Sequence, residues 1–121
     1  TPLLVPMIEE GFAYKKISRE IISTYLSNDR LQNIDKLLLA CTHYPLIQSE
    51  IESYYQNKVE VINSADIVAD HLYNSLEKSD LRQSGDSNED RFYVSDYTES
   101  FEKSTRLFFG EKISLKQVVL F

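Results

Sequence analysis

The residues most suited to chemistry are a cysteine followed at once by a hydroxyl and an imidazole, in the order Cys41-Thr42-His43. The reactive form of cysteine is the thiolate. His43 is close enough along the chain to exchange a proton with a group near the thiol or to orient it, and the Thr42 hydroxyl suits a substrate carboxylate. Such polar groups pack poorly in a core, so the triplet indicates a site.

Three other interpretations of Cys41 can be weighed. Free cysteine is among the most frequently buried residue types, so Cys41 could serve packing alone. Nucleophilic catalysis of the Cys–His type is also open, although no third partner is evident. Zinc binding by Cys41, His43 and His71 is disfavoured because their spacing matches no usual zinc pattern, and no metal is expected. We expect His71 to be a hydrogen-bonded core or boundary residue.

A strand and a helix are predicted on either side of this triplet. Residues 37–40 form a continuous apolar run, which is typical of a strand covered on both faces in a parallel sheet. Pro45 suits the first position of a helix. The apolar stripe of that helix would be Leu46, Ile47, Ile51, Tyr54 and Tyr55. The start of a helix favours an anion, and hence a thiolate at Cys41.

Strands and helices alternate along the rest of the chain. Further strands are predicted at residues 3–5, 59–62, 92–94 and 118–120. A helix over residues 13–28 would carry Ile17, Ile21, Ile22 and Tyr25 on one face. Another, capped by Asn63 or Ser64, would carry Ile67, Val68, His71, Leu72 and Leu76. A third would begin after Thr98, carry Phe101, Thr105, Leu107 and Phe108, and end at Gly110. Residues 79–90 are polar and predict a mobile loop.

This alternation predicts an α/β fold with a mainly parallel sheet and right-handed crossovers. In such sheets, sites lie where strands end and run into helices. The candidate positions are those after Val5, Ala40 and Val94, and Cys41 occupies the second.

Composition limits the classes of partner. The 121 residues are 42% hydrophobic and 26% charged, which suits about one domain, and 13 basic against 19 acidic side chains give a net charge of −6. An acidic surface repels phosphates, so neither nucleic acid nor an anionic membrane is expected as a partner. No apolar run approaches the ~20 residues that span a bilayer. We expect a cytoplasmic protein, and the single cysteine fits a reducing compartment.

Several segments resemble bacterial glutamate racemases. Residues 38–47, LLACTHYPLI, resemble the family's segment around its second catalytic cysteine, and residues 1–11, TPLLVPMIEEG, are similar to its upstream motif. Residues 61–65 and 92–96, then Phe101 and the pair Phe109-Gly110, resemble later segments in the right order. Related aspartate and hydantoin racemases share parts of the cysteine block.

The resemblance implies a cofactor-independent isomerase that interconverts L- and D-glutamate and so supplies D-glutamate for peptidoglycan, cell-wall biogenesis and cell shape. Its enzymes use two cysteines on opposite faces of the α-carbon, one removing the proton and one returning it. By position, Cys41 is one acid/base, His43 assists it, and Thr42 binds the substrate. Glu9 matches the acidic residue that supports the histidine, with Glu10 as the alternative.

The resemblance also implies an incomplete enzyme. The family has two similar α/β domains with the active site between them. Residues 1–64 would be the latter part of the second domain, and residues 65–121 the segment that returns to the first. The family's first cysteine and Asp-Ser-Gly segment have no counterpart here, since Cys41 is the single cysteine. Asn63 replaces a common Asp, and Ser95-Asp96 a common Thr-Gly or Thr-Asp. The chain also begins with Thr1-Pro2, without an initiator Met.

We therefore expect a fragment that is inactive alone and whose exposed strand edges favour a homodimer. Two alternatives remain. The parent could racemise aspartate or another amino acid, or the chain could be a non-enzymatic α/β binding module in which Cys41 is structural.

Overall fold

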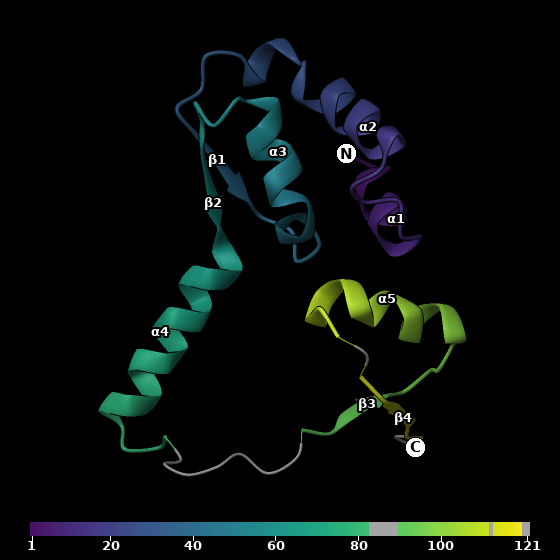
Figure 1. Cartoon of the computed structure of the whole chain (residues 1–121). Helices are drawn as coiled ribbons and strands as arrows, with labels where there is room; N and C mark the ends of the chain where they lie inside the picture. The colour runs from purple at the N-terminus through teal and green to yellow at the C-terminus, as the bar shows by residue number, and fades with distance from the viewer. Residues whose placement is uncertain (83–89, 112, 120–121) are drawn as a thin grey trace. The chain divides into compact units, whose positions relative to one another are not determined.

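The chain forms two compact units, Thr1–Arg82 and Gln83–Phe121, in a computed structural model (Figure 1). The structure describes residues 1–82, 90–111 and 113–119, without the side chains of residues 100, 103, 104 and 107. Each unit contains one pair of parallel strands, together with several helices in the first unit and the helix α5 (Glu99–Phe109) in the described part of the second. The predicted α/β class with parallel strand pairing is confirmed.

In the first unit, β1 (Lys36–Leu39) pairs with β2 (Glu60–Asn63), so that Leu39 lies opposite Asn63 at the carboxyl ends. Leu39 is 2% exposed, whereas Leu38 is 57% exposed. Neighbouring residues of a strand point to opposite faces. β1 was predicted to be covered on both faces. This is wrong within the part of the chain that the structure describes, where only the face that carries Leu39 is covered.

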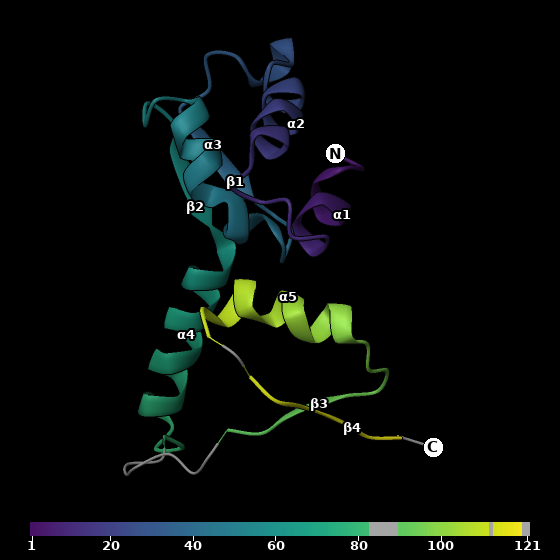
Figure 2. The same ribbon diagram turned by 45° about the vertical axis from the view of Figure 1, so that its right-hand side comes forward.

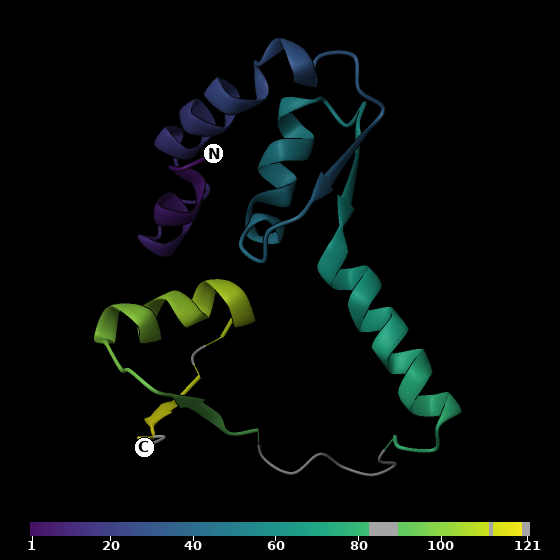
Figure 3. The same ribbon diagram turned by 180° about the vertical axis from the view of Figure 1, so that it is seen from behind.

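Helices supply that cover in two layers. α3 (Gln48–Tyr54) lies between the strand pair and α2 (Lys16–Leu26) (Figures 1 and 3), and contacts with both are present. A 3₁₀ turn, η2 (Tyr44–Ile47), leads into α3, and another, η1 (Asp29–Leu31), follows α2. The core of this unit consists of Leu4, Met7, Ile8, Ala13, Ile22, Leu26, Leu39, Ile47, Ile51 and Val59.

The buried side of α2 matches the predicted one in part, since Ile22 is buried and Ile21 and Tyr25 are half-buried. Ser18, Ile22 and Leu26 are buried, whereas Ile17 is 47% exposed. The Ser18 hydroxyl lies 2.6 Å from Glu50 Oε1 on α3. This polar contact turns the Ser18 side of α2 toward α3 and leaves Ile17 at the surface.

The strand predicted at residues 3–5 is wrong, because this segment begins the helix α1 (Leu4–Glu9). Leu4, Met7 and Ile8 follow the i, i+3, i+4 spacing of a helix and are all buried. Pro6 is tolerated because an N–H in the first helical turn has no intrahelical acceptor.

The predicted cap at Asn63 is confirmed for α4 (Ser64–Lys78), since its side chain accepts a hydrogen bond from the Ala65 N–H at 3.0 Å. The Ser64 hydroxyl donates to the Leu39 carbonyl at 2.8 Å, which ties the start of α4 to the end of β1. From there α4 runs away from the strand pair (Figure 1), and none of its residues is buried.

In the second unit, β3 (Phe92–Val94) and β4 (Leu115–Gln117) are joined through α5 (Glu99–Phe109), which lies along them (Figure 2). Both predicted ends of α5 are confirmed. The Thr98 hydroxyl accepts from the Phe101 N–H at 3.1 Å, and Gly110 ends the helix with φ of 72°. A left-handed residue after the last turn is where glycine has no steric penalty.

The last predicted strand is wrong in position. Residues 115–117 form the ladder, Val118 contributes one further bond to the Val94 carbonyl, and Val119 is 83% exposed. The strand begins earlier than its apolar residues suggest because Leu115 pairs with Phe92. Three predicted features lie outside the described residues. They are Leu120 of the last strand, residues 83–89 at the centre of the predicted loop, and the side chain of Leu107.

Replacing Glu50 with alanine should destabilise the first unit. Its two carboxylate oxygens lie 2.6 Å from the fully buried Ser18 hydroxyl and 3.0 Å from the Tyr14 N–H. Ser18 has a second acceptor in the Lys15 carbonyl at 2.7 Å, so we expect a loss of about 1–2 kcal/mol in the free energy of unfolding.

Urea denaturation measures this loss, with Glu20→Ala as the control. Glu20 makes an exposed pair with Lys16 at 3.9 Å, and its loss should change the free energy by no more than ~0.5 kcal/mol. Equal effects of the two substitutions would contradict the buried role of Glu50.

Stability should also fall in alkaline solution through Tyr55. Burial raises the pKa of Tyr55 above 10.0, and the neighbouring Tyr54 phenol raises it further. Below pH 10 both states keep the proton, whereas above it the unfolded chain loses the proton first, which favours unfolding. Urea midpoints of the chain and of Tyr55→Phe, compared from pH 8 to 11, should converge as the pH rises. A constant difference would argue against this shift.

Candidate active site

Cys41 lies just beyond the carboxyl end of β1, half-buried and with a free thiol. Its carbonyl accepts the Tyr44 N–H at 3.1 Å and so closes the turn into η2, where Pro45 occupies an early position, as predicted. α3 itself begins only at Gln48. Because the dipole effect fades within one helical turn and α3 begins seven residues after Cys41, the predicted action of this helix on the thiol is wrong.

The imidazole of His43 lies between a carboxylate and a hydroxyl. Its Nε2 is 3.0 Å from Glu9 Oε1, and its Nδ1 is 3.4 Å from the Thr42 hydroxyl. The side chains of His43 and Glu9 are 25% and 57% exposed. A carboxylate at Nε2 favours the N–H on that nitrogen, which leaves the lone pair of a neutral ring on Nδ1.

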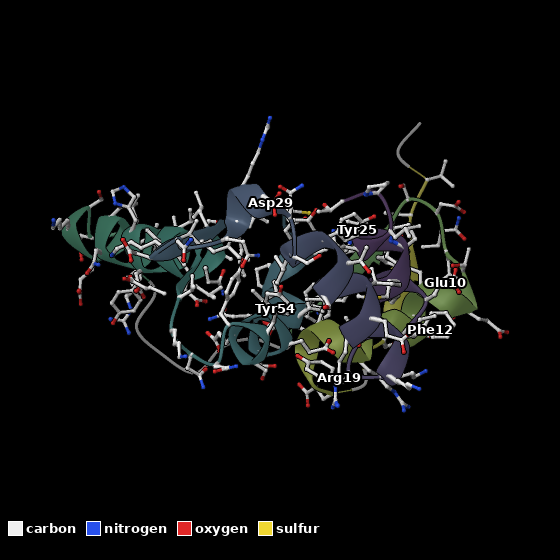
Figure 4. The ribbon with its side chains drawn as sticks, turned by 90° about the horizontal axis from the view of Figure 1, so that it is seen from above. Glu10, Phe12, Arg19, Tyr25, Asp29 and Tyr54 are labelled. Carbon is white, nitrogen blue, oxygen red and sulfur yellow. The ribbon has the colours of Figure 1, made fainter. Side chains whose placement is uncertain are left out.

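Glu9, and not Glu10, is the acidic residue that reaches His43. Glu9 is the last residue of α1, which packs against η2. Glu10 is the residue that follows the helix, and it is labelled in Figure 4.

Sequence reasoning missed Tyr14, which holds the same turn from another side. Its hydroxyl donates to the Leu46 carbonyl at 2.6 Å, and its N–H donates to Glu50 at 3.0 Å. Tyr14 has φ of 62°, a left-handed conformation that is rare for an aromatic residue. The Tyr44 hydroxyl also contacts the Thr1 hydroxyl. No local pattern could reveal these contacts, because each joins residues far apart in the chain.

His71 does not join this group. It lies on α4 and is exposed, so its predicted core or boundary position is wrong. Across residues 1–82, 90–111 and 113–119, no cluster of three or more His, Cys, Asp or Glu side chains is arranged to hold a metal ion. The chemistry brought together is one thiol, one hydroxyl and one histidine–carboxylate pair.

A cavity of about 590 Å³ lies elsewhere, between α2 and α3. Tyr14, Arg19, Glu50 and Tyr54 are among the residues that line it. Of these, Arg19 and Tyr54 are labelled in Figure 4. Cys41, His43 and Glu9 do not line it, so the cavity is separate from the candidate active site.

Within the part of the chain that the structure describes, every helix is too short or too polar to cross a bilayer.

Comparison with known proteins gives a consistent result, although no family model matches the chain. The glutamate racemase of Chlorobaculum parvum is 37% identical over 113 residues, which is 93% of this chain and 42% of that protein. The glutamate racemase of Persephonella marina is 35% identical over 119 residues, 98% of this chain and 44% of that protein.

Solved structures agree. The glutamate racemase of Francisella tularensis in complex with D-glutamate matches 96% of this chain and 44% of its own, with a TM-score of 0.79 and 31% identity. That of Thermus thermophilus in complex with β-chloro-D-alanine matches 98% of this chain and 46% of its own, with a TM-score of 0.84 and 26% identity.

This chain belongs to the glutamate racemase family. It spans somewhat less than half the length of the glutamate racemases it matches.

The contact with Glu9 should fix the tautomer of His43. At pH 8, ¹⁵N chemical shifts should show the proton on Nε2, and Glu9→Ala should give a mixture of tautomers because the acceptor is lost. The exposed His71 is an internal control and should not respond. A His43 ring already mixed in the unsubstituted chain would argue against the contact.

Proposed function

We propose that this chain supplies one of the two proton-transfer faces of a glutamate racemase. The observation that carries this proposal is the set of contacts that join Glu9, His43 and Thr42 in the turn that follows Cys41, in a chain that belongs to this family. Cys41 is the acid/base, Thr42 binds the substrate, and His43, held by Glu9, assists the thiol.

The chemistry follows from the α-carbon of an amino acid. The Cys41 thiolate takes the α-proton, and the electron pair of the C–H bond moves into the carboxylate. A second thiol on the opposite face then delivers a proton to the α-carbon, which inverts its configuration. Each group must lie within hydrogen-bond reach on its own side. Cys41 is the single cysteine of this sequence, so it serves one face and the second thiol must come from outside residues 1–121.

The proposed substrate is glutamate, because the matched protein of Francisella tularensis was solved with D-glutamate. No cofactor is required, since both protons pass through thiols. The proposed role is the supply of D-glutamate for peptidoglycan, in the cytoplasm. Residues 1–64 would belong to one α/β domain of the complete enzyme, and residues 65–121 to the segment that returns to the other.

The isolated chain should not racemise glutamate, because it has one thiol. Circular dichroism of D-glutamate incubated with the chain should stay constant. The signal should decay once the chain replaces its matched segment in the Chlorobaculum parvum racemase. In that hybrid, Cys41→Ala should lower kcat by ~10²–10⁴-fold because one proton-transfer group is lost.

Glu20→Ala is the matched control on the hybrid and should keep kcat, since Glu20 lies on the exposed side of α2. Turnover by the isolated chain would refute the half-site. A hybrid that racemises aspartate and not glutamate would refute the substrate, and full activity of Cys41→Ala would refute the role of the thiol.

A further inference from the structure

We propose that Tyr14 is a positioning residue for the proposed proton transfer and acts through the turn that carries Cys41 and His43. Its hydroxyl holds the backbone of this turn, and its own N–H is held by a carboxylate on α3. The inference rests on the proposed function, because it names a residue that determines how accurately the thiol of that same site is placed.

Packing and local preference do not account for the conformation of Tyr14. The residue is 53% exposed, so burial of its ring contributes little. Its φ of 62° is left-handed, which costs free energy for a residue with a Cβ atom. Strain of this kind persists where surrounding contacts require it, and it is frequent at functional sites. At Tyr14 the contacts are two hydrogen bonds, one from the hydroxyl and one from the N–H.

The hydroxyl of Tyr14 reaches the turn itself, where it donates to the Leu46 carbonyl at 2.6 Å. The Leu46 N–H donates to the His43 carbonyl at 3.1 Å, and the Tyr44 N–H donates to the Cys41 carbonyl at 3.1 Å. A displacement of Leu46 would therefore be passed along the backbone to His43 and Cys41.

The N–H of Tyr14 is tied to the packed interior of the first unit. It donates to Glu50 Oε2 at 3.0 Å, and Glu50 Oε1 lies 2.6 Å from the Ser18 hydroxyl. Ser18 is fully buried near the start of α2, and its hydroxyl accepts the Lys15 N–H at 3.1 Å. Tyr14 therefore links a fixed point at the start of α2 to the turn of the candidate site.

The role of Tyr14 differs from that of Glu9. Glu9 contacts the imidazole of His43, whereas Tyr14 holds the backbone that carries both His43 and Cys41. A proton-transfer group must lie within hydrogen-bond reach of the proton it takes. Because a misplacement of ~1 Å can lower a rate by ~10²-fold, a contact that fixes the backbone of the turn affects the reaction without touching the substrate.

The test removes the hydroxyl alone with Tyr14→Phe. In the full chain, the amides of Tyr44 and Leu46 should exchange at least ~5-fold faster because the turn opens more often. The ¹⁵N spectrum of the His43 ring should also show a mixture of tautomers, since a mobile turn weakens the contact with Glu9.

Activity is measured in the hybrid with the Chlorobaculum parvum racemase. Tyr14→Phe should lower kcat by ~10-fold because the thiol is less often in place. KM should change by no more than ~3-fold, because substrate contacts outside the turn remain.

Tyr55→Phe is the matched control. The Tyr55 hydroxyl also donates to a backbone carbonyl, that of Leu31 at 3.4 Å, and Tyr55 follows the opposite end of α3 from the turn. Both substitutions should lower the urea midpoint, whereas only Tyr14→Phe should lower kcat and change the His43 spectrum.

Tyr14→Gly is a second variant, which keeps the test decisive if Tyr14→Phe folds poorly. Glycine has no steric penalty at φ of 62°, so this chain should fold. The hydroxyl is again missing, and kcat of the hybrid should again fall by ~10-fold.

The outcomes separate this proposal from the proposed function. A folded Tyr14→Phe hybrid that keeps full kcat overturns the positioning role and leaves the function intact. An equal loss of kcat with Tyr55→Phe also overturns it, because the effect would then be one of stability alone. A hybrid that does not racemise glutamate refutes the function. In that case a changed His43 spectrum in the full chain supports the positioning by Tyr14, and an unchanged spectrum overturns it.

Discussion

The contact between Glu9 and His43 connects the two parts of the first unit on which the candidate site depends. Glu9 closes α1, whereas His43 lies in the turn that follows β1, and their side chains meet at 3.0 Å. Without α1, the imidazole would lose its contact with the Glu9 carboxylate, and the turn would have one fewer tie to the body of the unit. The helix therefore forms part of the site, and its buried residues Leu4, Met7 and Ile8 hold the carboxylate in place.

The same turn is fixed by a second set of polar contacts. Tyr14 reaches the Leu46 carbonyl with its hydroxyl and Glu50 with its N–H, and Glu50 also meets the buried Ser18 hydroxyl. A left-handed Tyr14 costs free energy that its two hydrogen bonds offset. These contacts link the segment just before α2 to η2 and α3, the turn and the helix that follow His43.

Local signals were predicted well, and long-range ones were not. The caps at Asn63, Thr98 and Gly110 depend on a residue and its next few neighbours, and the structure has all three. The strand predicted at residues 3–5 became α1 because the burial of Met7 and Ile8 outweighed a short apolar run. Ile17 and Leu38 were expected inside, but their exposure depends on which faces find partners. For the site, the Cys41-Thr42-His43 triplet was evident from sequence, whereas Tyr14 and Glu50 were not.

The candidate site and the uncovered surfaces of the first unit have a common physical origin. In the proposed reaction, proton removal and return at one carbon require groups on both of its sides, and Cys41 would provide one of them. In the same unit, Leu38 on β1 is 57% exposed and no residue of α4 is buried by the described residues. A parallel strand pair normally has helices on both faces. A polypeptide that covers Leu38 would therefore lie beside the carboxyl end of β1, which is also where the proposed reaction calls for a second thiol.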